Sequence, residues 1–183
     1  MVDDAVAAML RDGDRAMLRL YVAACSERMA PLFIGLRAGM TGREADVDFY
    51  VASVRDLWFT DQPLTDAADR VRLLEQFPEL EPSEEGITGV ADTYAFFAVL
   101  ALRYAFVANG TSDGEAAVSC GHASLTAMGM LDQNITGARF LEEEQRLQAL
   151  SMSDGGGSLW DMSVTAGRER LRAALSRTTR HLG

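Results

Sequence analysis

The sequence contains no lysine, and it has few of the side chains that bind metal ions. All 17 basic residues are arginine, and only two histidines and two cysteines occur among the 183 residues. Cys25 and Cys120 lie among apolar neighbours, without the Cys-x-x-Cys spacing of zinc and redox sites. The sequence therefore predicts two buried free thiols, no disulfide and no bound metal.

The sequence also lacks the features of membrane and nucleic-acid-binding proteins. Its longest apolar run without a charge, Thr93–Leu102, is shorter than the roughly 20 residues of a membrane-spanning helix. Its start, with Asp3 and Asp4, is acidic where a signal peptide is basic, so we expect a cytoplasmic protein. A net charge of −10 would repel phosphate, which argues against nucleic acid and favours a basic or neutral protein partner.

Stretches of alternating apolar and polar residues, which would predict β-strands, are missing as well. The apolar residues instead recur at helical spacing, and residues 89–108 are apolar on nearly every side, as in the central helix of a bundle. The sequence predicts an all-α protein, a single compact bundle of six or seven helices. Its one domain (1–183) divides into a bundle core (1–154), a glycine linker (155–157) and a C-terminal helix (158–183).

Motifs of catalysis are few, and each has a structural explanation. Gly110–Gly114 matches the Gly-x-Ser-x-Gly pattern of serine hydrolases, but the segment before it is helical, whereas that motif follows a strand. Ser112 and Glu115 also form a helix capping box. No phosphate-binding glycine loop and no Glu-x-x-His pair occurs, so we expect no cofactor and favour a protein that is not an enzyme.

The sequence does contain charged residues on otherwise apolar helices. In the segment AACSERMAPLF (23–33), Pro31 has no N–H for the carbonyl of Glu27, so we expect a bend there, with the Arg28 guanidinium donating to the freed oxygen. Other predicted helices carry similar charges, which together predict a buried polar network that either fixes helix register or forms a ligand pocket. Its candidate members are Glu27, Arg28, Asp56, Asp92, Arg103 and His122.

Charge is also distributed unevenly along the chain. Residues 61–92 hold nine acidic residues against Arg70 and Arg72, whereas residues 167–183 hold five arginines against Glu169. Either both segments are solvated surfaces, or they dock on each other, within one subunit or between two, because the glycine linker lets the last helix swing. The helix at 113–133, rich in small residues, is a second candidate for self-association.

Four segments resemble a known bacterial family. AACSERMAPLF, VRDLWF, GVADTYAFFAVLALRYAF and DGEAAVSCGHASLTAMGMLD, in this order and spacing, are similar to the family called domain of unknown function 416. The likeness covers about residues 15–135, and Cys25–Pro31 is its most specific part. The resemblance implies a compact helical bundle and no particular reaction. Its motif residues include Glu27, Arg28, Asp56 and Asp92.

These observations favour a non-catalytic binding or assembly module with an acidic surface, which binds a protein partner or a second copy of itself. One alternative is an immunity-type inhibitor of a basic toxin. Another is a small-molecule-binding protein or an unrecognised enzyme that uses the buried Glu/Arg/Asp network. A closed core would favour the binding module, whereas an open pocket lined by Glu27, Arg28, Asp92 and His122 would favour the last alternative.

Overall fold

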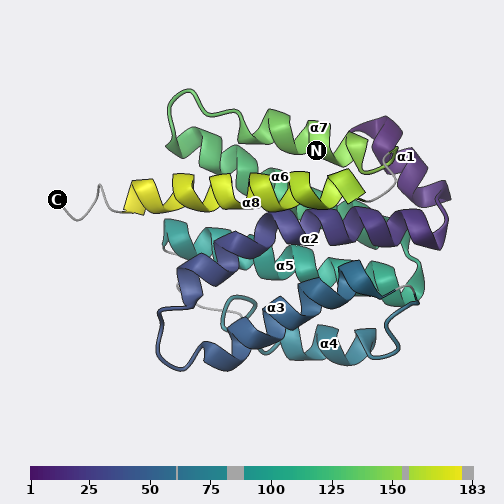
Figure 1. The fold of residues 1–183 in the computed structure, drawn as a ribbon, viewed down its shortest axis with the longest axis horizontal. Helices are drawn as coiled ribbons and strands as arrows, with labels where there is room; N and C mark the ends of the chain where they lie inside the picture. The colour runs from purple at the N-terminus through teal and green to yellow at the C-terminus, as the bar shows by residue number, and fades with distance from the viewer. Residues whose placement is uncertain (61, 82–88, 154–156, 179–183) are drawn as a thin grey trace.

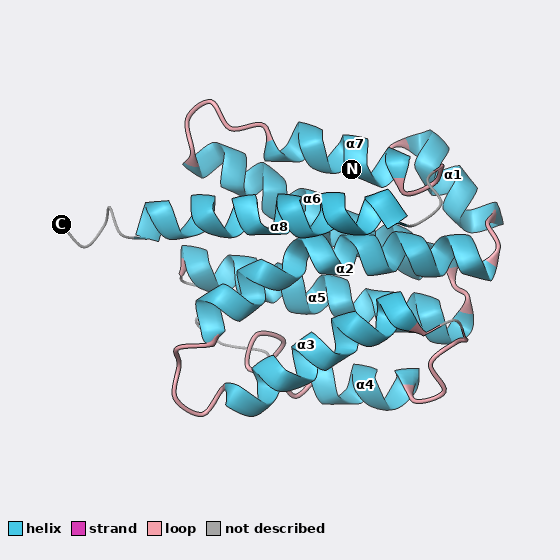
Figure 2. Cartoon of the chain, viewed as in Figure 1, coloured by secondary structure: helices cyan, strands magenta, loops and turns pink. Residues whose placement is uncertain are grey.

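The structure, a computed structural model, describes residues 1–60, 62–81, 89–153 and 157–178, with side chains up to residue 176. These residues form helices and no strand, so the predicted all-α fold is confirmed (Figures 1 and 2). There are eight helices in the described part of the chain, where six or seven were predicted. The helices are α1 (Asp4–Asp12), α2 (Arg15–Arg37), α3 (Glu44–Phe59), α4 (Ala67–Leu74), α5 (Val90–Thr111), α6 (Gly114–Asn134), α7 (Phe140–Leu150) and α8 (Gly157–Thr178).

Helices α2 and α5 form the centre of the bundle. Helix α2 packs against α3, α5, α6 and α8, and α5 packs against α2, α4 and α6. In Figure 1, α8 lies along α2 on the near side, while α3 and α4 form the lower edge. The apolar character of α5 fits this position, since Ala95, Leu102 and Phe106 have no exposed surface. By length and composition α5 would also suit a membrane, a test that core helices of soluble proteins pass too.

Aspartate side chains cap the N-termini of three of the helices. Asp3, Asp14 and Asp113 accept hydrogen bonds from the first free backbone N–H groups of α1, α2 and α6. Ser112 does not cap α6, as its spacing to Glu115 had suggested. It ends α5 in a left-handed conformation (φ 57°), and its Oγ accepts a hydrogen bond of 2.7 Å from Arg15. Ser112 thus links the end of α5 to the start of α2.

The small residues of α6 are used inside the bundle. Ala117, Cys120, Ser124 and Ala127 are fully buried, and α6 packs against α1, α2, α5 and α7. Small side chains allow this close packing of a helix with several neighbours. The stripe that had suggested self-association is therefore covered by the protein's own helices.

Helix α8 packs along α2 as part of the bundle. Of the predicted linker, residues 155 and 156 lie outside the described residues, and Gly157 is already the first residue of α8. Gly167 approaches α2 so closely that a Cβ there would lie 2.9 Å from Pro31 Cγ and 3.1 Å from the Arg28 carbonyl oxygen. The proline that interrupts α2 therefore packs directly against a glycine of α8.

We predict that Gly167→Ala lowers the stability of the protein although alanine favours helices. A helical Gly→Ala substitution normally stabilises by about 1 kcal/mol, but here the methyl group would push α8 away from α2, and such overpacking typically costs about 1–3 kcal/mol. Gly129→Ala in α6 is the matched control, because the nearest atom would lie 3.9 Å from its new Cβ. Urea unfolding should show a loss for Gly167→Ala and a gain for Gly129→Ala. Equal gains would contradict the close contact.

Candidate functional site

The six residues of the predicted network do not come together in one site. Three of them form ion pairs in separate places: Asp56 with Arg70 at 2.7 Å, Asp92 with Arg37 at 2.7 Å, and Arg103 with Glu75 at 2.6 Å. These pairs join α3 to α4, α2 to the start of α5, and α5 to the end of α4. Their exposed or half-exposed carboxylates suit surface contacts between neighbouring helices.

His122 holds the N-terminal segment against α6. Its Nδ1 accepts a hydrogen bond of 3.2 Å from the Val2 backbone N–H. Partial burial and the nearby N-terminal amino group lower the pKa of His122, so the imidazole is neutral at physiological pH. His122 therefore has a structural role in this fold, because it holds the N-terminal segment in place.

Arg28 forms a buried ion pair that the sequence did not predict. Its Nε donates to Oε2 of Glu144 at 2.8 Å and its Nη2 to Oε1 at 2.9 Å, a two-pronged geometry. Nη1 donates to the Ser163 hydroxyl at 3.3 Å, and Nη2 also lies 3.3 Å from the Cys25 sulfur. The guanidinium is thus bound to side chains, where a bond to the carbonyl freed by Pro31 had been expected.

A second arginine shares the same carboxylate. Arg170 on α8 donates from Nη2 to Oε2 of Glu144 at 2.7 Å. Its Nε and Nη1 are buried without a hydrogen-bond partner among the described residues. We call Arg28, Glu144 and Arg170 the buried arginine cluster. It joins α2, α7 and α8, and it holds two positive charges against one negative charge.

The electrostatics of the cluster keep Glu144 ionised. Burial alone would raise the pKa of its carboxyl, but the charges of Arg28 and Arg170 and a hydrogen bond from Gln148 lower the pKa to about 2. Burial likewise opposes the charge on Arg28, yet Glu144 raises the Arg28 pKa above its usual value. Glu144 and Arg28 are therefore charged at neutral pH.

Polar neighbours connect the cluster to α6. Gln148 donates to Oε1 of Glu144 at 2.8 Å and to the Gly121 carbonyl at 3.0 Å, and it accepts a bond of 2.9 Å from the Tyr21 hydroxyl. Burial raises the pKa of Tyr21 well above its usual value. A contact with Cys25, together with burial, does the same for the Cys120 thiol. Both groups stay protonated at neutral pH.

The cluster is closed to solvent. The side chains of Arg28, Glu144 and Arg170 have no exposed surface. A substrate would therefore contact none of these groups without moving a helix. In the part of the chain that the structure describes, no three His, Cys, Asp or Glu side chains lie close enough together to bind a metal ion.

Sequence reasoning missed Glu144 and Arg170, although their positions carried a signal. Residues Glu142–Glu144 form a charge run that usually marks a solvated surface, but Glu144 shares a helix face with the apolar Leu147. Arg170 shares a face with Ser163, Ala166, Gly167 and Ala174, all of which are buried. A charge within a stripe of small or apolar residues is the pattern that would have predicted burial.

Most of the described acidic residues of the segment 61–92 form ion pairs with nearby arginines. Asp61, Glu84 and Glu85 lie outside the described residues. Arg37 and Arg43 both bind Glu79, at 2.6 Å each, and they lower its pKa against the effect of burial. Ion pairs also join other acidic residues of this segment to arginines, namely Asp66, Asp69, Glu75 and Asp92.

A groove of about 200 Å³ between α2, α3 and α8 contains the remaining predicted residue, Glu27. The side chains of Trp58, Phe59 and Trp160 line it together with Glu27. Glu27 is half-buried and forms no ion pair within the described chain. Burial raises its pKa, and the neighbouring Trp58 indole and the charge of Arg168 offset part of that rise. We call this feature the aromatic groove.

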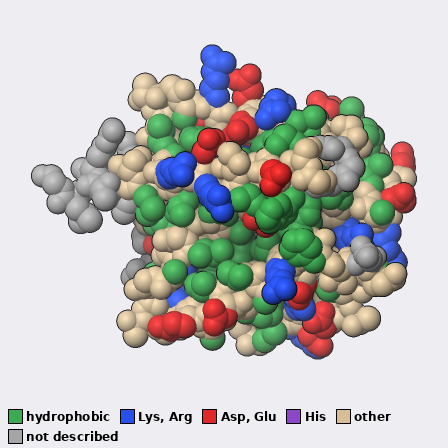
Figure 3. Space-filling view, viewed as in Figure 1, with side chains coloured by type: hydrophobic (Ala, Val, Ile, Leu, Met, Phe, Trp, Pro, Cys, Tyr) green, Lys and Arg blue, Asp and Glu red, His purple; other side chains and the backbone are tan. Residues whose placement is uncertain are grey.

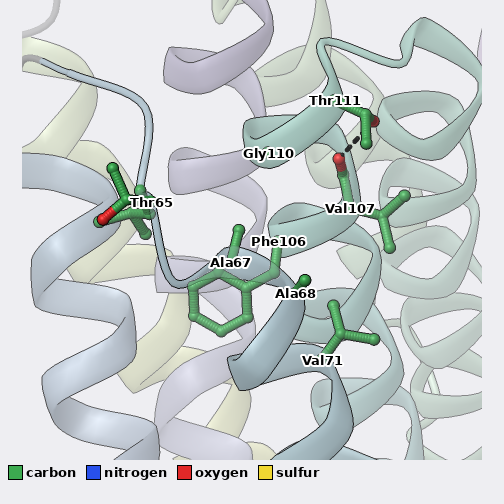
Figure 4. A pocket seen from close by; sticks show the side chains of 9 residues that line it. Thr65, Ala67, Ala68, Val71, Phe106, Val107, Gly110 and Thr111 are labelled. Carbon is green, nitrogen blue, oxygen red and sulfur yellow. Dashed lines mark hydrogen bonds between the residues drawn. The ribbon is translucent and has the colours of Figure 1, made fainter.

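A larger pocket of about 320 Å³ lies between α4, α5 and the segment before α4 (Figure 4). Its lining is apolar apart from two threonines, and the Thr111 hydroxyl already donates to the Val107 carbonyl at 2.7 Å. No charged side chain lines it. The pocket therefore offers little chemistry for recognising a ligand.

Comparison of the chain with family models, with curated proteins and with solved structures gives no significant match. The resemblance to the domain of unknown function 416 consequently stays an expectation from the sequence motifs.

We predict that the two buried arginines differ in their importance for stability. Arg28→Met should lower the free energy of unfolding by about 3–5 kcal/mol, because Glu144 loses its two-pronged partner. Arg170→Met should cost clearly less, since it removes the excess charge and two unbonded N–H groups. Arg11→Met is the control, because its ion pair with Glu115 is half-exposed and pairs of that kind contribute about 0–1 kcal/mol. Urea unfolding measures all three, and equal costs for Arg28 and Arg170 would contradict this assignment.

We also predict a specific loss of stability in acid. The Glu144 pKa is about 2 in the folded state, against a usual value of 4.5. A lowered carboxyl pKa contributes stability that is complete above pH 4.5 and disappears as the pH falls towards 2, on the order of 3 kcal/mol in total. Glu144→Gln should therefore show a flatter dependence of unfolding free energy on pH between 5 and 3 than the wild type. Glu142→Gln, at an exposed position, should keep the wild-type slope.

Proposed function

We propose that this protein is a non-catalytic binding module that docks a protein partner on the face formed by α2, α3 and α8. One observation carries the proposal: two large aromatic side chains remain exposed there. Phe59 at the end of α3 is 70% exposed and Trp160 at the start of α8 is 39% exposed. Their rings meet edge to face, with centroids 6.4 Å apart.

The surroundings of the pair support a docking surface. Figure 3 shows hydrophobic side chains gathered over the middle of this face, where α8, α2 and α3 lie. Val51, one of the residues lining the aromatic groove, is 46% exposed as well. Exposed apolar patches of this kind usually mark interaction sites, and Trp residues are enriched among the strongest contacts of protein interfaces.

The closed interior supports a binding role over catalysis. The side chains of the buried arginine cluster have no exposed surface, and three of the predicted network residues, Asp56, Asp92 and Arg103, form ion pairs in separate places. Two buried free thiols, Cys25 and Cys120, support a cytoplasmic location, where cysteines stay reduced. The family resemblance adds no activity to this proposal.

Charge supports a partner other than a second copy of this chain. Two copies that each carry −10 repel one another, whereas a basic protein is attracted. The C-terminal arginines that had suggested self-docking include Arg170, which is buried in its own subunit. An immunity-type inhibitor of a basic toxin is one form that such a binding module takes.

We predict that partner binding depends on the exposed aromatic pair. Phe59→Ser and Trp160→Ser should each lose a protein that wild-type bait captures from cells of the native host, without lowering the melting temperature, because both rings are exposed. Met40→Ser, at a residue that is 47% exposed away from the groove, should retain the protein. The captured protein is then purified, and its complex is reconstituted and measured by light scattering.

The proposal fails if no captured protein is lost with both aromatic variants, or if the reconstituted complex forms equally well with them. A wild-type mass of a dimer without added protein, reduced to a monomer by Phe59→Ser, would identify a second copy as the partner instead.

A further inference from the structure

Glu27 in the aromatic groove is a carboxylate that could act as the counter-ion of a bound cation. Its carboxylate is half-buried beside the neutral Trp58 indole, and within the described residues it has no charged partner in an ion pair. Removing a carboxylate from water without such a partner is unfavourable. A cation that enters the groove would replace, by its electrostatic attraction, the hydration that the carboxylate loses on burial. The position therefore favours a positively charged group.

The aromatic rings around Glu27 favour the same chemistry. Trp58 and Trp160 lie on two sides of the groove, from α3 and α8, and Phe59 lies next to Trp58. The faces of aromatic rings, above all of tryptophan, attract ammonium and guanidinium groups. The buried Trp58 Nε1 has no well-aligned hydrogen-bond partner. The groove thus combines aromatic rings, which can pack along an aliphatic stem, with a carboxylate, which can pair with a positively charged end group.

The size of the groove indicates one side chain rather than a whole ligand. Its volume of about 200 Å³ lies below the roughly 300–1,000 Å³ of pockets that enclose drug-sized molecules. The groove also adjoins the exposed pair Phe59 and Trp160, which a protein partner would cover. A protruding side chain of that partner would reach Glu27.

We propose that the aromatic groove receives a basic side chain of the protein partner, with Glu27 as its counter-ion and the rings of Trp58 and Trp160 along its aliphatic stem. This inference rests on the proposed function, and it adds the chemistry of the residue that the partner inserts.

Two arginines of this chain compete with the incoming cation. Arg55 on α3 lines the groove, and Arg168 on α8 lies close enough to lower the pKa of Glu27. Neither forms an ion pair with Glu27 in the structure, and both side chains are exposed. Each of them weakens the attraction for a second cation. Removing one should therefore strengthen binding, which a merely apolar groove would not show.

The two tryptophans make the groove directly observable. The chain has only two, Trp58 and Trp160, and both line the groove. Titration with N-acetyl-arginine amide and N-acetyl-lysine amide should change the intrinsic fluorescence in a saturable way. N-acetyl-citrulline amide, a neutral analogue of the arginine compound, should bind at least roughly tenfold more weakly, a difference of about 1.4 kcal/mol.

Variants of Glu27 and Arg55 test the assigned roles. Glu27→Gln should weaken binding of the arginine compound about tenfold or more, with an unchanged far-ultraviolet circular dichroism spectrum, while Arg55→Gln should strengthen it. Glu143→Gln on α7, away from the groove, should behave as the wild type. Equal binding of the citrulline compound, or no effect of Glu27→Gln, would overturn the proposal.

A second measurement separates this inference from the proposed function. If the captured partner binds Glu27→Gln as tightly as the wild type but is lost with Phe59→Ser, the docking surface stands and the cation site is wrong. If the arginine compound binds through Glu27 but no partner depends on Phe59, the groove is a site for a free organic cation, and both the proposed function and the partner's side chain are wrong.

Discussion

The pairing of Arg28 with Glu144 is the constraint on which the arrangement of three helices depends. A guanidinium without solvent access needs an ionised partner in direct contact, because stranding either charge costs several kcal/mol. Glu144 satisfies this need only while α7 lies beside α2 at one register. Arg170 then adds α8 to the same carboxylate, at the level where Gly167 lets α8 approach Pro31. The excess positive charge is tolerated because Arg170 keeps its hydrogen bond of 2.7 Å to the Glu144 carboxylate.

This use of charge inside the bundle determines what is left for recognition at the surface. Arg28, Glu144 and Gln148 are bonded to one another inside the bundle, and arginines neutralise most of the described acidic residues of the segment 61–92. The aromatic groove lies where three helices meet, and it combines apolar rings with the Glu27 carboxylate, which has no ion pair among the described residues. A rigid framework of this kind suits a docking surface, because little conformational entropy is lost when a partner binds.

Periodicity was sufficient to predict the helices, whereas the partners of the charged residues were not predictable. The apolar circumference of α5 indicates its central position, since only a buried helix is apolar all round. Glu144, by contrast, belongs to a run of three glutamates, and only the packing of α7 against α6 and α8 decides which one is buried. Asp113 and Ser112 compete for the same cap, and local spacing does not decide between them. Such choices depend on contacts between segments far apart in the sequence.

The opening motif shows how one short segment serves two purposes. Glu27 and Arg28 are adjacent, so an α-helix turns their side chains about 100° apart. Arg28 points into the bundle, where α7 and α8 supply its partner and close it off. Glu27 lies in the groove towards α3 and α8, where its neighbour is the neutral Trp58 indole and no described arginine forms an ion pair with it. The backbone that places Glu27 in the groove is fixed by the neighbouring ion pair and by the contact of Pro31 with Gly167. Changes at Arg28 should therefore disturb both folding and the groove, whereas changes at Glu27 affect the groove alone.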